Sequence, residues 1–399
     1  MSQTKAPPHL ITLILLAGIS PLALNMFLPS LANIAAEFET DYATVSWAVS
    51  GYLAITAGIQ LIVGPLSDRI GRRPVLLLAL ATFSAASVGC VMAQNIETFL
   101  MFRMLQGGMT AGYTLSMAIV RDTKSEREAI SLIGYIGMSM AVAPMLGPML
   151  GGVLDTVFGW RATFIFYAMA GFFLLVMCWI DLGETRQRQE VAAGTKPLRA
   201  GALLREPLFW AYALCGAFSV GAFYIFLTGV PLVAASTFGV STAELGFFIG
   251  TITIGFMLGG FLTGRYGARY RVSTTMILGR VIACGGLSLG LLLFSLGFTS
   301  PAVFFASTIC VGLGNGFTMP GSNTGVMSVR PSLAGSAAGL MGAMIVGLGA
   351  MVTAGTGMVM TAYPGPRTLL VMMLVSSAIG LALAVLAARL AGRNAGASG

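Results

Sequence analysis

Two polar side chains, Asn25 and Arg103, stand well inside long apolar stretches of the sequence. Arg103 lies about six residues inside its stretch, which is roughly 9 Å along a helix that rises 1.5 Å per residue. Polar and ionisable groups at such a depth in a membrane are costly, and they mark transport pathways or proton relays. An arginine can instead extend its head group to the interface, and an asparagine can simply bond a neighbouring helix, at about 0.6 kcal/mol. Both interpretations of each residue stay open on the sequence alone.

Residues for hydrolytic, metal or redox chemistry are sparse. His9 is the only histidine, and the five cysteines all fall inside apolar stretches without a CxxC pair. A Ser-His-Asp hydrolase or a histidine-based metal site therefore has no basis, and the cysteines are expected to be small buried hydrophobes. No Asp or Glu lies in the middle of an apolar stretch. The sequence predicts no enzyme, no cofactor and no metal site, and no loop is long enough for the output domain of a sensor.

The apolar stretches that carry Asn25 and Arg103 indicate a membrane protein. The chain is 56% hydrophobic and only 9% charged, with a mean hydropathy of +0.88, whereas soluble domains contain about 25% charged residues. A helix that crosses a bilayer needs roughly 20 apolar residues. Twelve such stretches predict an all-α integral membrane protein with twelve transmembrane helices at 9–31, 45–65, 74–93, 97–119, 130–153, 161–181, 207–230, 243–264, 273–296, 301–323, 333–360 and 367–389. The first stretch is longer than the apolar region of a signal peptide, so we expect it to be retained.

The positive charges follow the predicted topology. The net charge is +8, and most of the 22 Lys and Arg residues fall in alternate loops and at the termini. This bias marks the cytoplasmic side of a membrane protein and predicts that both termini are cytoplasmic. The basic character therefore indicates topology, and we expect a lipid bilayer and no nucleic acid as partner.

The twelve stretches divide into two sets of six. Between them lies the longest polar segment, 182–206, which we interpret as a cytoplasmic linker between an N-terminal bundle, 1–181, and a C-terminal bundle, 207–399. The halves resemble each other at an offset of about 200 residues, as internal repeats do in transporters. The segment GPLSDRIGRR corresponds to GFLTGRYGAR, and RMLQGGMTAGY corresponds to CVGLGNGFTMP. The matching order predicts two parallel six-helix repeats.

The loop after the second stretch resembles a family motif. Its sequence GPLSDRIGRR matches nearly every position of the major facilitator loop motif, Gly-x-Leu-Ala-Asp-Arg-x-Gly-Arg-Lys. In that family the motif latches the two halves together on the cytoplasmic side, so the resemblance implies a latch; a topology signal without a gating role is the alternative. The residues of this predicted latch are Gly64, Asp68, Arg69, Gly71, Arg72 and Arg73.

Two further motifs are similar to those of drug exporters. The fourth stretch contains RMLQGG, which resembles an Arg-x-x-Gln-Gly motif and implies that Arg103 takes part in proton coupling. The fifth contains APMLGPMLGG, which matches the antiporter motif Gly-Pro-x-x-Gly-Gly, where proline interrupts the helix. The residues of this predicted antiporter motif are Pro144, Gly147, Pro148, Gly151 and Gly152.

Together the motifs make the chain similar to the twelve-helix drug/proton antiporter family of the major facilitator superfamily. The segments FLPSL, FGWRATF and GSAAGL are most similar to its bicyclomycin/chloramphenicol-resistance (Bcr/CflA) branch. The resemblance implies two pseudo-symmetric six-helix bundles that bind substrate between them and exchange it by a rocker-switch movement. It also implies a monomeric multidrug exporter of the bacterial inner membrane, with a lipophilic or amphipathic small-molecule substrate and protons as the coupling ion.

The chain departs from this branch in its first stretch. The branch usually reads Asp-Met-Tyr-Leu-Pro there, whereas this chain begins the same segment with Asn25, which cannot titrate. Three interpretations remain: proton exchange through Arg103 with a boundary acid such as Asp122, Glu97 or Glu244, a substrate that itself carries the charge, or uncoupled facilitation. The resemblance favours proton coupling, and Asp122 is taken as the coupling partner. A metabolite exporter or facilitator without proton coupling is the alternative function.

The substrate cavity is predicted to be mostly apolar. Methionine adapts its shape and suits promiscuous binding surfaces. By helix position and resemblance, the expected wall residues are Asn25, Met26, Tyr113, Met117, Tyr135, Met138, Phe223, Tyr224, Phe317, Asn323 and Met344. Arg280 is expected at the cytoplasmic boundary as a structural residue.

Overall fold

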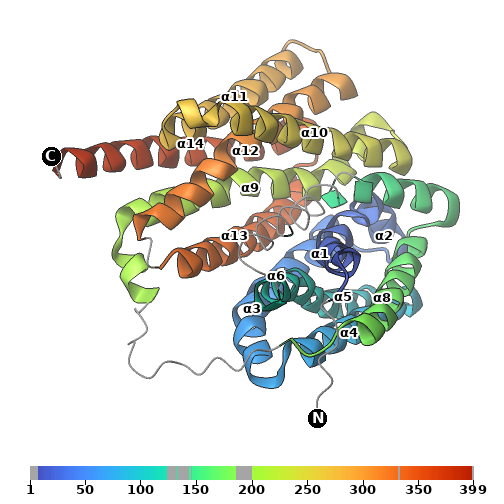
Figure 1. The fold of residues 1–399 in the computed structure, drawn as a ribbon. Helices are drawn as coiled ribbons and strands as arrows, with labels where there is room; N and C mark the ends of the chain where they lie inside the picture. The colour runs from blue at the N-terminus through green and yellow to red at the C-terminus, as the bar shows by residue number, and fades with distance from the viewer. Residues whose placement is uncertain are drawn as a thin grey trace. The chain divides into compact units, whose positions relative to one another are not determined.

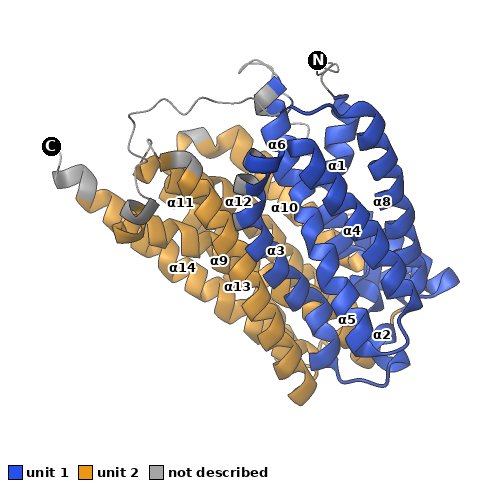
Figure 2. Ribbon diagram, turned by 90° about the horizontal axis from the view of Figure 1, so that it is seen from below, with its two compact units in different colours: residues 1–192, 241–247 blue, residues 193–240, 248–399 orange. Residues whose placement is uncertain are grey.

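A computed structural model describes residues 8–123, 132, 143–144, 146–185, 200–330 and 333–397. Within these ranges every regular element is a helix (Figure 1). Nine of the described helices are long and apolar enough to cross a membrane. The chain divides into unit 1, residues 1–192 and 241–247, and unit 2, residues 193–240 and 248–399 (Figure 2). The predicted linker, 182–206, contains residues 186–199, which lie outside the described part, so the predicted bundle limits stay a prediction.

Unit 1 is built from helices that differ in regularity. Its elements are α1 (Leu10–Asn25), η1 (Leu28–Ser30), α2 (Leu31–Glu37), α3 (Tyr42–Ile70), α4 (Arg72–Met92), α5 (Ile96–Leu105), η2 (Gln106–Thr110), α6 (Ala111–Thr123), the helix Leu146–Phe158 and α8 (Arg161–Asp181). The fourth apolar stretch thus runs as α5 and α6, joined by the tighter 3₁₀ turns of η2. Such turns inside a long helix often mark a functional position.

The first apolar stretch is broken where it carries Asn25. α1 ends at Asn25, and the chain continues through η1 into α2 as far as Glu37. Pro29 has no N–H for the carbonyl of Asn25, four residues earlier, so regular α-helix cannot continue through this point. The single helix predicted for 9–31 is therefore two helices with a turn between them, and the turn exposes carbonyl groups to other partners.

Unit 2 contains longer helices. Its elements are η3 (Ala200–Arg205), α9 (Pro207–Val233), the π-helical η4 (Ala234–Phe238), α10 (Thr242–Tyr266), η5 (Gly267–Arg269), α11 (Val272–Ser295), α12 (Pro301–Val329), α13 (Ala334–Ala362) and α14 (Pro366–Ala397). The first residues of α10 group with unit 1. α11 and α12 approach so closely that a Cβ at Gly279 would overlap the carbonyl oxygen of Gly314. Small residues allow this close packing of helices in lipid.

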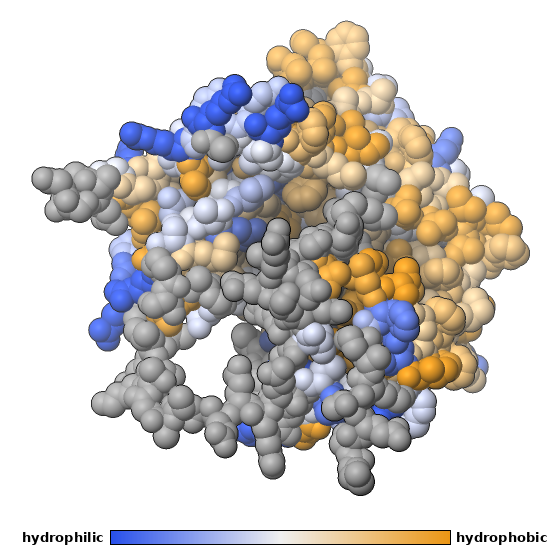
Figure 3. All heavy atoms as spheres, viewed as in Figure 1, coloured by the Kyte–Doolittle hydropathy of each residue, from blue (hydrophilic) through white to orange (hydrophobic). Residues whose placement is uncertain are grey.

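The outer surface is suited to lipid. Apolar side chains cover much of the face shown in Figure 3. On α8, for example, Phe172, Phe173 and Trp179 are each at least 60% exposed. In water such a surface would favour aggregation, whereas a bilayer solvates it.

Candidate functional site

Arg103 lies at the centre of unit 1 and is completely buried. Its guanidinium donates from Nη2 to the carbonyl of Ala23 at 2.9 Å and from Nε to the carbonyl of Ala48 at 3.2 Å. Its third nitrogen, Nη1, donates to Oε1 of Gln106 at 2.6 Å. One side chain on α5 therefore ties together α1, α3 and η2. The guanidinium is not at the surface, as it would be if it extended to a membrane interface.

The contact with α1 is made at the end of that helix. The last carbonyls of a helix lack internal partners and form the negative end of its dipole. Tyr167 of α8 donates its hydroxyl to the same carbonyl, that of Ala23, at 3.2 Å and to Leu22 at 3.3 Å. Arg103 and Tyr167 thus cap the broken end of α1 with a cation and a hydroxyl. The carbonyl of Leu22 also accepts the backbone N–H of Met26 at 2.9 Å, so Ala23 is the acceptor that the end of α1 leaves to Arg103 and Tyr167.

Aromatic rings complete the surroundings of the guanidinium. Its central carbon lies 4.1 Å from the ring centre of Phe27 and 4.3 Å from that of Tyr52. The π-faces of aromatic rings attract a cation, more strongly where water is excluded. Gln106 continues the network and donates from Nε2 to the hydroxyl of Ser87 on α4 at 2.7 Å. The hydrogen-bond acceptors of Arg103 in the described part of the chain are all neutral, so dipoles and rings stabilise its charge.

Asn25 is buried two residues beyond the carbonyl that Arg103 holds. Its side chain is 2% exposed, and Nδ2 donates to the carbonyl of Pro21 in its own helix at 2.7 Å. Its Oδ1 has no hydrogen-bond partner among the described residues. The amide thus acts as a donor that closes the last turn of α1. A carboxylate at this position could not make that bond.

The helix Leu146–Phe158 packs on the same broken end of α1. A Cβ at Gly151 would overlap the carbonyl oxygen of Met26, and one at Gly147 would lie 3.4 Å from the backbone nitrogen of Met26. Gly151 is therefore required by a backbone-to-backbone contact, and Gly147 lies in van der Waals contact with the same segment. Gly152 meets Thr242 in the same way, within the segment that groups with unit 1. Of the other residues of the predicted antiporter motif, Pro148 is buried and Pro144 is half-buried.

The predicted latch contains a capped helix start. Gly71 has a φ of 109°, which suits glycine, and it turns the chain from α3 into α4. The carboxylate of Glu184, just after α8, accepts the backbone N–H of Arg72 at 2.9 Å and that of Arg73 at 3.4 Å. These are orphan donors at the start of α4, where an anion is favoured.

The arginine side chains of the predicted latch turn in different directions. Arg72 donates to the hydroxyl of Ser67 at 2.5 Å, Arg73 donates to the carbonyl of Trp179 at 2.9 Å, and Arg69 is exposed. The surroundings of Gly64 and Asp68 lie outside the described part. The latch therefore stays a prediction, and Glu184 is a partner that the sequence interpretation missed.

Comparison with known proteins assigns the family. The family model of the Major Facilitator Superfamily matches residues 13–354. The chain belongs to the Major Facilitator Superfamily. It is therefore a multi-pass membrane protein of a transporter family, with the all-α, twelve-helix fold that the sequence predicts.

Two relatives cover at least 80% of this chain, and a third covers a smaller part. The MFS-type transporter YdgK of Bacillus subtilis (strain 168) is 32% identical over 85% of this chain and 86% of its own length. The multidrug resistance protein MdtL of Escherichia coli O139:H28 is 29% identical over 80% and 81%. A chloramphenicol resistance protein of Pseudomonas aeruginosa is 32% identical over 62% of this chain and 59% of its own. These relatives confirm the predicted resemblance to the drug-resistance transporters of the superfamily.

A solved structure shares the superfamily fold. The crystal structure of a bacterial homolog to the human lysosomal transporter Spinster superposes with a TM-score of 0.79 at 18% identity, over 95% of this chain and 96% of that chain. At this identity the likeness concerns the fold alone.

The remaining predicted cavity residues are spread over several helices of this superfamily member. Tyr113 and Met117 are half-buried on α6, and in unit 2 Tyr224 is buried on α9 and packs at Gly349 of α13. Asn323 is exposed on α12. Phe223, Phe317 and Met344 are half-buried on α9, α12 and α13. Tyr135, Met138 and the side chain of Asp122 lie outside the described residues, so the cavity and the coupling role of Asp122 stay predictions.

One acid is buried within the protein, near the end of its helix. Asp155, in the helix Leu146–Phe158, is 7% exposed, and it is the only buried Asp or Glu among those whose surroundings the structure describes. Its Oδ2 accepts from Nδ2 of Asn33 on α2 at 2.7 Å. Glu97 and Glu244 are exposed, and Glu244 accepts from the backbone of Ser241 at 2.8 Å. Asp155 follows the fifth predicted stretch, 130–153, and its position at the end of that helix did not predict that it is buried.

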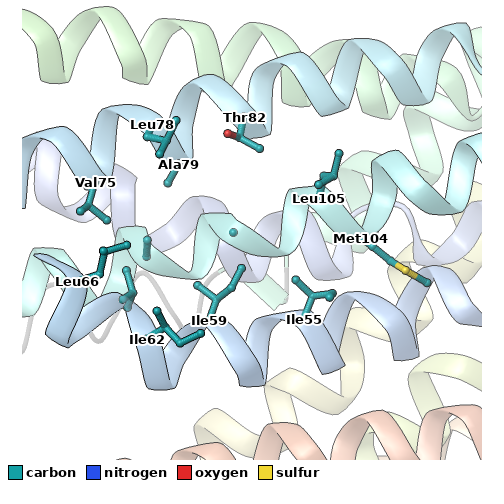
Figure 4. A pocket seen from close by; sticks show the side chains of 13 residues that line it. Ile55, Ile59, Ile62, Leu66, Val75, Leu78, Ala79, Thr82, Met104 and Leu105 are labelled. Carbon is teal, nitrogen blue, oxygen red and sulfur yellow. The ribbon is translucent and has the colours of Figure 1, made fainter.

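Unit 1 also has an apolar groove of 340 Å³ (Figure 4). α3 and α4 form its two sides, and the segment from α5 to α6 forms its floor. Thr82 is the one lining residue with a polar side chain, so the groove suits hydrocarbon. It is lined by Ile55, Ile59, Ile62, Val63, Leu66, Val75, Leu78, Ala79, Thr82, Met104, Leu105, Gly108 and Ala111.

Proposed function

We propose that this protein exports amphipathic small molecules across the bacterial inner membrane by rocker-switch exchange of its two halves. The observation that carries the proposal is the packing of Gly151 on the backbone of Met26, with Gly147 in contact with the same segment. The antiporter motif thereby lies directly on the broken end of α1. The names of the relatives support the direction of transport, since one is a chloramphenicol resistance protein and another a multidrug resistance protein. The distribution of Lys and Arg supports cytoplasmic termini, and a monomer is the simplest unit.

We further propose that transport is coupled to protons through Asp155. The carboxyl group of Asp155 is buried, and the side chain that donates to it, Asn33, is neutral. Asp155 lies four residues beyond Gly151, on the same face of the helix. A buried acid on a transport helix is the usual proton carrier in such proteins. Asn25 cannot titrate, and Arg103 is engaged at all three nitrogens. In this mechanism Arg103 positions α1, while Asp155 gains and loses the proton.

The alternative is a facilitator or metabolite exporter without proton coupling. The observation that favours it is Asn25, which donates a hydrogen bond where the Bcr/CflA branch has an acid. The two functions differ in whether protons move when substrate moves.

Direction of transport is tested by accumulation of chloramphenicol, as a probe, in bacteria that lack their own exporters. We expect expression of the wild type to lower accumulation, and Gly151→Ala to abolish the effect because the new methyl group meets the carbonyl of Met26. Gly58→Ala on α3 is the matched control, because a Cβ there has no neighbour within 4 Å. Membrane levels are compared by immunoblot. Unchanged export by Gly151→Ala at equal membrane level would contradict the proposed role of this contact.

Coupling is tested in proteoliposomes that contain a pH-sensitive dye. We expect a gradient of an exported compound to move protons in the wild type. Asp155→Asn should move the compound without protons, while Glu97→Gln, which changes an exposed acid, should behave as the wild type. Proton movement that persists in Asp155→Asn would exclude Asp155 as the carrier, and no proton movement in the wild type would favour the facilitator.

A further inference from the structure

Unit 2 contains a second completely buried arginine, Arg280, whose surroundings differ from those of Arg103. It is the ninth residue of α11 (Val272–Ser295), about 12 Å from the start of that helix at 1.5 Å per residue. Nη2 donates to Oδ1 of Asn315 at 2.6 Å, and Nε donates to the hydroxyl of Thr318 at 3.0 Å. Its third nitrogen, Nη1, is buried and has no hydrogen-bond partner among the described residues.

The charge of Arg280 also lacks compensation. The sequence of unit 2 contains a single acidic side chain, Glu206, and Arg330 already donates to it at 2.6 and 3.0 Å. Among the described residues no aromatic ring lies over Arg280, whereas two rings lie over Arg103. A buried cation without a counter-charge is costly and is usually paired or functional.

Further buried hydroxyl groups lie on the helices around Arg280. The hydroxyls of Ser322 on α12 and Ser377 on α14 are buried; that of Ser377 has no partner among the described residues, and that of Ser322 has only the weakly accepting thiol of Cys215 beside it. Asn315, Thr318 and Ser322 are spaced i, i+3 and i+7, so they share one face of α12. Ser377 lies one turn before Gly380, where a Cβ would be 3.3 Å from Cδ of Arg280. Unit 2 thus combines one unpaired guanidinium nitrogen with buried hydroxyl groups on adjacent helices.

α12 has a point of bending at this cluster. Pro320 lies between Thr318 and Ser322 inside the helix, so it has no N–H for the carbonyl of Gly316. That carbonyl instead accepts the hydroxyl of Thr263 from α10 at 3.2 Å. Helices bend readily at such prolines. Bending here would move Ser322 relative to Asn315 and Thr318, the two residues that hold Arg280.

From these observations we propose that Arg280 binds an anionic group, with Nη1 as its donor and the hydroxyls of Ser322 and Ser377 as candidate additional donors. Guanidinium groups recognise carboxylates and small inorganic anions through such charge-assisted bonds. The anion is either a free ion such as chloride or the carboxylate of a transported solute. The second source rests on the proposed export function, and it gives that function a substrate class, namely amphipathic molecules with an acidic group.

The test measures thermal unfolding of the purified full-length protein in lipid nanodiscs, which requires no transport. Sodium chloride, sodium benzoate and the bulky polyhydroxylated anion gluconate are compared at equal ionic strength, with benzamide as the uncharged analogue of benzoate. A ligand that binds only the folded state raises the unfolding temperature saturably, here by roughly 3–8 °C. Stabilisation by chloride identifies a free-anion site, and stabilisation by benzoate but not by chloride or benzamide identifies a carboxylate site. An equal unfolding temperature in all four additions overturns the proposal.

Three variants separate binding from a purely structural role. Arg280→Met removes the charge at similar volume, and we expect it to fold and to lose the anion-dependent shift. Arg280→Lys should keep a shift that needs higher anion concentrations, because an ammonium has no planar fork. Arg389→Met, at an exposed position of the same unit, is the matched control and should respond as the wild type. A shift that persists unchanged in Arg280→Met would overturn the proposal. Because export is not measured, failure here leaves the proposed exporter function untouched.

Discussion

Replacement of Arg103 by lysine separates the geometry of the guanidinium from its charge. In the wild type three nitrogens reach three acceptors on different elements, the carbonyls of Ala23 and Ala48 and the amide of Gln106. A lysine ammonium is a single point charge and can retain about one of these bonds. It also loses much of the stacking on Phe27 and Tyr52. We therefore expect Arg103→Lys to keep the charge but release the end of α1.

The size of the effect follows from the interactions that a lysine cannot make. Two hydrogen bonds inside a membrane protein contribute about 0.6 kcal/mol each on average, and two cation–π interactions about 0.5–1 kcal/mol each. The free energy of unfolding should therefore fall by about 2–3 kcal/mol, or roughly 30- to 150-fold in the equilibrium constant. Unfolding in mixed micelles with increasing dodecyl sulfate measures it, and drug accumulation measures export.

Arg389→Lys, on the exposed surface of α14, is the control for the substitution. It should alter neither stability nor export. If Arg103→Lys unfolds within about 0.5 kcal/mol of the wild type and exports normally, the fork of hydrogen bonds does not hold α1, and the reasoning fails.

Three further changes test individual contacts. Glu184→Gln should destabilise by about 0.5 kcal/mol, and less at high salt, because a neutral amide caps α4 less well than an anion; thermal unfolding that is the same at low and high salt for both proteins would contradict this. Gly279→Ala should separate α11 from α12 and cost about 1–3 kcal/mol, whereas Gly285→Ala on the open side of α11 should not; equal thermal stability of the two would refute the close crossing. In Asn25→Asp the new side chain can donate to the carbonyl of Pro21 only when it is protonated. The folded state therefore binds a proton that the unfolded state releases, and the free energy of unfolding falls as the pH rises. The fall is up to about 1.4 kcal/mol per pH unit above pH ~4. Unfolding temperatures measured from pH 5 to 8 check it, and a flat difference from the wild type would show that the bond is unimportant.

The fold was largely predictable from the sequence because lipid imposes a simple rule. A helix that crosses the membrane must be long and apolar, and the stretches that meet this rule are visible in the sequence. The interruptions were harder to predict. The break at Pro29 was not predicted, since 9–31 was expected to be one helix. The 3₁₀ turns of η2 have no proline, and they arise at Gln106 and its two following glycines, where tertiary contacts decide the conformation.

The sequence placed Arg103 inside an apolar stretch, and the structure buries it completely, whereas its partners were not predictable. Sequence spacing places it inside the membrane, but two of its acceptors are backbone carbonyls, which every residue possesses and no motif records. Arg280 shows the same limit. It was expected at the cytoplasmic boundary, which stays a prediction, and the sequence did not predict that it is completely buried beside Gly380, whose missing side chain leaves room for it. The role of Glu184 could have been suggested only by its position, as an acid just beyond the sixth apolar stretch.

The asparagine at position 25 and the contacts of Arg103 have a common physical explanation. A buried guanidinium needs negative charge or dipoles around it, and here the end of α1, the amide of Gln106 and two rings supply them. A carboxylate at position 25 is not required for that purpose, and it would lose the bond that Asn25 donates to Pro21. The side chain at position 25 therefore does not titrate, and the guanidinium of Arg103 holds the end of α1. Proton exchange then needs another acid, and Asp155 lies on the helix whose glycines contact the same end of α1. Protonation of Asp155 would act on α1 through that helix. In the proposed mechanism the charge of Arg103 would hold the site in place, and the charge of Asp155 would change.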